Sequence, residues 1–125
     1  VNIGLFCSTP MVAVSRNLSN KHSMEMLLTG ELISSVKAAK IGLINDVIEI
    51  NELKDFVLDK AKKISKKSLV TLKIGKEAFY KQLDMKLSDA YDYASKVMVQ
   101  NMLKLDAKEG IDAFIDKREP NWKDK

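Results

Sequence analysis

Two glycines, Gly30 and Gly42, each follow an apolar run with helical spacing, and they constrain the fold more than any other feature. Glycine takes the left-handed conformation that ends many helices at little cost, so each one marks a helix exit. Ser34 or Ser35 can cap the helix between them through its hydroxyl. The stretch 24–47 therefore predicts a helix, a bend, a short helix and an extended segment, and it contains no obvious catalyst.

Capping signals divide the rest of the chain into further helices. A serine, threonine, asparagine or aspartate before an apolar run accepts a hydrogen bond from the first backbone N–H groups of a helix. The expected N-caps are Thr9, Ser19, Asn51, Ser68 and Asp106, with Thr9 followed by Pro10 and Asp106 forming a capping box with Glu109. These signals predict a mainly α fold with two or three short extended segments in the N-terminal half.

The first residues are apolar and extended in character. Val1, Ile3, Leu5 and Phe6 resemble the end of a buried strand that enters a turn. A strand at a terminus needs neighbours, and the remaining sequence offers few strands. We therefore expect the chain to be a fragment that lacks an N-terminal part holding most of a sheet.

Apolar residues cover two faces of the expected helix 87–105. One face runs along its whole length, and Val99 with Leu103 begins a second face near its C-terminal end. A helix that is apolar on two faces packs against two surfaces at once. The expected last helix has a single buried side, formed by Ala107, Ile111, Phe114 and Ile115.

Composition places the chain among ordinary globular proteins. It has 125 residues, a formal net charge of +4 and one cysteine. No apolar run approaches the roughly 20 residues of a membrane-spanning helix, and no signal peptide is visible. Cys7 cannot form an internal disulfide, which favours a reducing compartment, and we interpret it as a small buried hydrophobe. The mild positive charge is weak support for an anionic partner.

The sequence contains few groups of residues that could form a catalytic or metal site. The sequence has no CxxC, HExxH, Walker or GxGxxG motif, and one histidine with one cysteine cannot form a typical zinc site. His22 lies on a polar helix face, where a solvated role is expected. Glu25 lies between two methionines and is interpreted as partly buried and structural. The sequence predicts no catalytic residue and no metal ligand.

A basic and aromatic cluster near the C-terminus is the best candidate for binding. Lys117, Arg118 and Lys123 lie close in sequence to Phe114 and Trp122. Cations beside aromatic rings suit a phosphorylated ligand with a flat base, because the cation contacts phosphate and the ring contacts the base. The alternative is a solvated tail with a core aromatic residue, in which Trp122 docks onto the protein.

Two segments carry a family resemblance that spans essentially the whole chain. The first is MEMLLTG at 24–30, followed in order by Ile33-Ser34, Ala38-Ala39, Gly42-Leu43-Ile44 and Val47. The second is KEGIDAFIDKR at 108–118. Both resemble the enoyl-CoA hydratase/isomerase (crotonase) superfamily, and the segment GLFCSTP at 4–10 is similar to one branch of it.

The resemblance implies the fold and the site. The family has an α/β fold in which a spiral of ββα repeats precedes a helical trimerisation region. Residues 1–50 would form the end of the spiral core, and residues 51–125 the helical oligomerisation region. The oxyanion-hole loops and the glutamates of the hydratases would lie upstream of Val1. Phe114 and Lys117 match positions that reach the adenine and phosphate of coenzyme A in a neighbouring subunit.

The resemblance also implies a function. It indicates an acyl-CoA-processing protein, either an enoyl-CoA hydratase or an isomerase, with a coenzyme A thioester as substrate and no prosthetic group. The expected assembly is a trimer or a dimer of trimers, in the cytoplasm or the mitochondrial matrix. Residues 7–11 replace the glycine-rich run typical of hydratases, which leaves the reaction open. The alternative is a non-catalytic module for coenzyme A binding or oligomerisation, and scattered lysines argue against nucleic acid.

Overall fold

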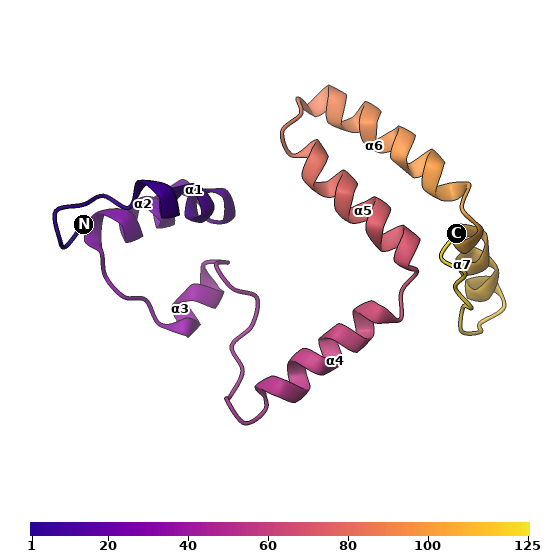
Figure 1. Cartoon of the computed structure of the whole chain (residues 1–125), viewed down its shortest axis with the longest axis horizontal. Helices are drawn as coiled ribbons and strands as arrows, with labels where there is room; N and C mark the ends of the chain where they lie inside the picture. The colour runs from indigo at the N-terminus through magenta and orange to yellow at the C-terminus, as the bar shows by residue number, and fades with distance from the viewer. The chain divides into compact units, whose positions relative to one another are not determined.

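The computed structural model describes all residues, Val1–Lys125, and contains seven helices and no strand (Figure 1). The chain divides into two compact units, Val1–Lys54 and Asp55–Lys125. The mainly α prediction is confirmed. The expected extended segments occur as irregular backbone, and none of them forms a strand. The prediction of a buried strand end at the N-terminus was wrong. Residues 2–4 form a turn and a bend, residues 5–7 are irregular, and the apolar side chains of this segment are exposed.

The N-terminal unit holds α1 (Ser8–Asn17), α2 (Asn20–Thr29) and α3 (Ser35–Lys40), and α1 packs against α2. Ser19 caps α2 as predicted, because its hydroxyl accepts a hydrogen bond from the N–H of His22. The predicted N-cap at Thr9 was wrong. Helix α1 already includes Thr9, and it begins after Cys7 without any side-chain cap.

Both glycine exits are confirmed. Gly30 ends α2 with φ +61°. Gly42 follows α3 with φ +85°, and the N–H of Leu43 donates to the carbonyl of Ala38 at 2.9 Å. This bond from the residue after a left-handed position back to the last helical turn is the Schellman motif. Ser34 caps the other end of α3 through the N–H of Lys37.

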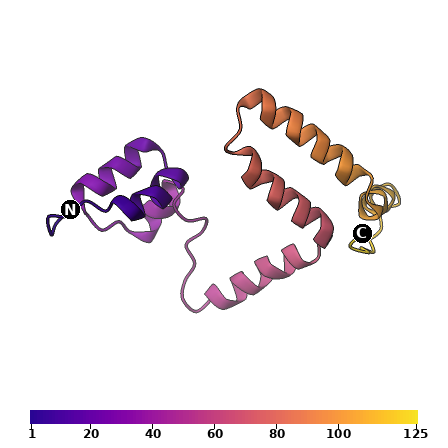
Figure 2. The same ribbon diagram turned by 45° about the horizontal axis from the view of Figure 1, so that its top comes forward.

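The C-terminal unit holds α4 (Leu53–Ser65), α5 (Leu69–Gln82), α6 (Leu87–Met102) and α7 (Leu105–Ile115). Helices α5, α6 and α7 pack on one another, and α5 and α6 run antiparallel around a short loop (Figures 1 and 2). Ser68 caps α5 as predicted. The predicted cap at Asn51 was wrong, since α4 begins two residues later, where the N–H of Leu53 donates to the carbonyl of Glu49.

Fully buried side chains are few, and half of them are polar. The buried set is Leu18, Ala38 and Ala113 together with Ser23, Ser68 and Asp106. Large apolar side chains are mostly exposed, and those on the second face of α6 include Val99 and Leu103, with 61% and 80% exposure. No helix of the structure has both the length and the apolar character needed to cross a membrane.

Candidate functional site

The exit of α7 brings Phe114 and Lys117 onto one exposed corner. Phe114 lies in the last turn and is 85% exposed. Lys117 follows the helix with φ +54°, and the N–H of Arg118 donates to the carbonyl of Ala113 at 3.0 Å, again a Schellman motif. Both predicted ligand-binding residues are therefore exposed and close together in the chain at the exit of α7.

The packed face of α7 differs from the predicted one. Ile111, Phe114 and Ile115 were expected to be buried, and all three are exposed. The buried side chains of α7 are Asp106 and Ala113, which lie two turns apart on one face. The seven-residue spacing of Asp106 and Ala113 is compatible with one helix face. The apolar residues Ile111, Phe114 and Ile115 were the stronger signal, and they predicted a different buried face.

Glu109 forms the centre of a charged cluster beside Lys117. Its two carboxylate oxygens accept from the Arg118 guanidinium at 2.7 and 3.1 Å, and one of them also accepts from the N–H of Asn121 at 2.7 Å. Bidentate pairs of this kind are among the stronger charge-assisted hydrogen bonds. The Arg118 hydrogen bond, followed by that of Asn121, lowers the pKa of Glu109 to about 2. Arg118 also contacts Asp116 at 3.3 Å, and these partners raise its pKa.

Asp106 is almost fully buried and holds the end of the chain. Its oxygens accept from the N–H groups of Lys123 at 2.7 Å and Asp124 at 3.1 Å. Burial raises its pKa, but hydrogen bonds from the Ser68 hydroxyl and the two backbone N–H groups outweigh this, and the pKa of Asp106 is lowered. The predicted capping box was wrong, since Lys104 precedes α7 without a side-chain cap and Asp106 lies inside the first turn.

Trp122 docks onto the protein, as the alternative interpretation of the cluster predicted. Its Nε1–H donates to the carbonyl of Lys66 at 2.7 Å, and its ring lies so close to Gly110 that a Cβ there would meet it at 3.2 Å. Asp124 accepts from the N–H of Leu69 at 2.7 Å, at the start of α5. Residues 118–125, here called the C-terminal clasp, therefore join the start of α5 to α7.

The predicted basic cluster is divided by these contacts. Arg118 is held by two carboxylates and Trp122 is docked, whereas Lys123 contributes its backbone N–H to the clasp. Lys117 is exposed and makes no ion pair, and Phe114 is exposed three residues before it. The ammonium groups of Lys117 and Lys123 therefore remain without an ion-pair partner, whereas the guanidinium of Arg118 is occupied.

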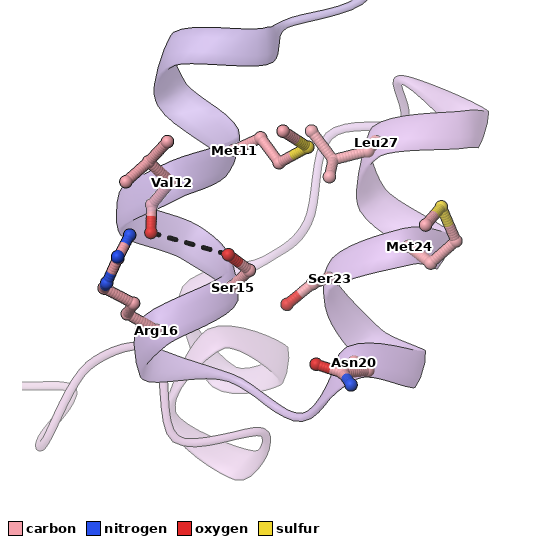
Figure 3. A pocket seen from close by; sticks show the side chains of 8 residues that line it. All are labelled: Met11, Val12, Ser15, Arg16, Asn20, Ser23, Met24 and Leu27. Carbon is pink, nitrogen blue, oxygen red and sulfur yellow. Dashed lines mark hydrogen bonds between the residues drawn. The ribbon is translucent and has the colours of Figure 1, made fainter. Parts of the chain in front are cut away.

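A second candidate is a cavity of about 290 Å³ between α1 and α2, which the sequence did not indicate. Met11 and Leu27 face each other across it, and the hydroxyl of Ser23 points toward α1, whereas that of Ser15 donates to the carbonyl of Val12 in its own helix (Figure 3). The Ser23 hydroxyl is buried and has no hydrogen-bond partner. No base contacts this hydroxyl, so the cavity holds no activated serine nucleophile.

The other residues considered from the sequence do not form a reactive group. Cys7 is exposed, so its interpretation as a buried hydrophobe was wrong. Glu25 is about half exposed, and it pairs with His22 at 3.8 Å and Lys37 at 3.6 Å. No group of three or more His, Cys, Asp or Glu residues is placed to hold a metal ion.

The structure is thus a set of helices in which Phe114 and Lys117 are exposed at the exit of α7. Residues 1–125 match the family described as Enoyl-CoA hydratase/isomerase, and the chain belongs to this family. It is 48% identical to the mitochondrial enoyl-CoA hydratase domain-containing protein 3 of Rattus norvegicus. The match extends over 122 residues, which are 98% of this chain and 41% of the relative. It is 30% identical to the mitochondrial enoyl-CoA hydratase of Pongo abelii, over 89% of this chain and 38% of the relative.

Solved structures agree with this membership. An enoyl-CoA hydratase of Mycobacterium smegmatis superimposes with a TM-score of 0.92 at 42% identity, over 97% of this chain and 47% of the solved chain. Human enoyl-CoA hydratase domain-containing protein 3 gives a TM-score of 0.90 at 45% identity, over 97% and 48%. The predicted family and branch are confirmed. The chain spans about two fifths of the curated relatives and about half of the solved chains that it matches.

Proposed function

We propose that the protein containing this chain processes acyl-CoA thioesters as an enoyl-CoA hydratase or isomerase. The oxyanion hole for the thioester would come from residues upstream of Val1, where backbone N–H groups stabilise an enolate-like state. Family membership and the names of the matched relatives, which include enoyl-CoA hydratases, support this proposal. The contribution of the chain itself would be to bind the nucleotide end of coenzyme A.

The exposed pair at the α7 exit is the observation that carries the proposal. Phe114 is 85% exposed, and Lys117, three residues later, is exposed and makes no ion pair, so neither side chain is engaged within the chain. An ammonium group offers a phosphate a compact charge with several N–H donors, and an aromatic ring offers adenine a face or an edge. Phe114 and Lys117 would therefore bind the adenine and phosphate of coenzyme A held by a neighbouring subunit.

Replacing Lys117 tests this function directly. In the whole protein, Lys117→Ala should weaken coenzyme A by about 1–3 kcal/mol, the range for a hydrogen bond to a charged group. Binding of 3′-dephospho-coenzyme A should change much less, because the contacted phosphate is absent. Titration calorimetry with both ligands measures the difference, and Lys108→Ala is a matched control on the same helix. Equal loss for both ligands, or no loss, would contradict the proposal.

Catalysis needs a separate assay. Addition of water to crotonyl-CoA by the whole protein would support the hydratase, and double-bond migration in a 3-enoyl-CoA would support the isomerase. If the protein binds coenzyme A but shows neither activity, the result would favour the non-catalytic module. We propose the mitochondrial matrix as the compartment, because the matched relatives are named as mitochondrial proteins. The cytoplasm is the alternative.

Assembly is part of the proposal, because the ligand would belong to another subunit. Val99 and Leu103 of the second face are exposed at the C-terminal end of α6, and so are Met98 and Met102 of the first face. Contiguous exposed apolar side chains mark interaction surfaces. We expect a trimer, or a dimer of trimers, and sedimentation of the whole protein measures it. Leu103→Glu should shift the protein toward monomers, and a folded wild-type monomer at high concentration would contradict the assembly.

A further inference from the structure

Lys117 occupies a conformation that its side chain does not favour. Its φ of +54° lies in the left-handed region, where glycine and asparagine are the common residues at a helix exit. Lysine gains no local hydrogen bond there that glycine would lack. Strained residues persist where the surrounding structure holds them, and they gather at functional sites.

The residues on the C-terminal side of Lys117 supply that hold. Arg118 donates its backbone N–H to Ala113 and its guanidinium to both oxygens of Glu109. Glu109 also receives the N–H of Asn121, so one carboxylate on α7 binds both ends of the segment 118–121. The backbone that follows Lys117 is therefore fixed to α7.

The same contacts set which cation is free. Arg118 could itself attract a phosphate, but Glu109 and Asp116 occupy its guanidinium at 2.7 and 3.3 Å. Lys117, the residue before Arg118, makes no ion pair. The Glu109–Arg118 pair thus removes one competing charge next to Lys117.

We propose that Glu109 and Arg118 are positioning residues that hold Lys117 in place for a phosphate group of its ligand. The inference rests on the proposed function, in which that ligand is coenzyme A. Neither residue needs to touch the ligand, so each acts through Lys117. Their replacement should matter only while Lys117 is present and only for a ligand that carries the contacted phosphate.

A double-mutant comparison in the whole protein tests this dependence. Glu109→Gln should weaken coenzyme A about 3- to 10-fold, because a displaced donor loses part of its hydrogen bond. Adding Glu109→Gln to Lys117→Ala should cause no further loss. Arg118→Lys keeps the charge but loses the bidentate geometry, so it should behave like Glu109→Gln. Affinity for 3′-dephospho-coenzyme A should stay within about twofold in every variant.

Controls separate positioning from simple charge or folding effects. Glu119→Gln removes a nearby carboxylate that does not bind Arg118 through its side chain, and it should leave affinity unchanged. Hydrogen exchange of residues 118–125 shows whether the clasp stays closed in each variant. Additive losses in the double mutant, or equal weakening of both ligands, would overturn the positioning role even if Lys117→Ala alone behaves as proposed. An unchanged affinity in Lys117→Ala would overturn the proposed function first.

Discussion

Helices α3 and α7 end in the same hydrogen-bond pattern but with different residues at the left-handed position. Gly42 ends α3 with φ +85°, and Lys117 ends α7 with φ +54°. A Cβ at Gly42 would meet no atom within 4 Å, so only the backbone conformation favours glycine there. The α7 exit has a lysine and, in addition, a charged clasp that holds the following residues. A helix exit can thus be stabilised locally by glycine, or from a distance by tertiary contacts that free the position for a functional side chain.

Removing the buried carboxylate of Asp106 should separate the two helix exits most strongly, because only the α7 exit depends on it. Asp106→Ala leaves the Ser68 hydroxyl and the N–H groups of Lys123 and Asp124 without their acceptor. Buried donors that lose a charged acceptor are costly, so we expect the largest fall in the free energy of unfolding among the changes discussed here. Thermal unfolding measures it, and hydrogen exchange should rise in the clasp but not around α3. The control is Asp92→Ala, an exposed carboxylate of α6.

Acid should open the α7 exit while leaving the α3 exit closed. The folded pKa of Glu109 is about 2, below its ordinary value of 4.5, so the folded state holds this proton less tightly than the unfolded state. Its contribution to stability is complete above about pH 5 and is lost as the pH falls toward 2. Glu109→Gln should flatten the dependence of stability on pH over that range. The lowered pKa of Asp106 leaves a residual slope of the same sign. An unchanged slope in Glu109→Gln would contradict the role of this pair.

Transferring lysine to the other exit should have a smaller effect. Gly42→Lys places a side chain at φ +85° without any clasp to hold it. The left-handed conformation costs an L-residue about 1–2 kcal/mol, and the free energy of unfolding should fall by about that amount. Denaturant titration measures the change. Gly42→Asn is the matched control and should cost less, because asparagine tolerates this conformation better.

The reciprocal change should have the smallest effect on stability and the opposite sign. Lys117→Gly relieves the strain at φ +54° but adds freedom to the unfolded chain, so we expect a gain of about 0.5–1 kcal/mol. The same variant should lose the affinity for coenzyme A that Lys117→Ala loses. Gain of stability with loss of binding would mark Lys117 as a residue kept for function, and lower stability would show that its side chain packs.

Local signals in the sequence predicted much of the helical framework. Ser19, Ser34 and Ser68 cap helices as expected, and the two glycines end them. The failures at Thr9 and Asn51 are shifts of one to a few residues in the start of a helix. A hydroxyl cap and a left-handed glycine act within one helical turn, so the spacing of residues is sufficient to find them.

The candidate site was predicted only in part. The sequence placed Phe114 and Lys117 one turn apart and predicted that they bind one ligand, which stays a prediction, while the exposure of Phe114 differs from the buried face expected for the last helix. It did not show that Arg118 would be taken up by Glu109, or that Asp106 would hold the tail instead of capping its own helix. The spacing of Asp106 and Glu109 fits a capping box equally well, so spacing alone cannot distinguish the two roles.

The sequence by itself determined the family and the mainly α framework. The tertiary structure decided which charges remain free. The partners of Asp106 lie 17 and 18 residues away, and Trp122 reaches a carbonyl 56 residues away. Contacts of that separation form only when the chain has folded back on itself, so no local pattern records them. The pairing of Arg118 with Glu109 also depends on the folded chain, and it leaves Lys117 without an ion pair.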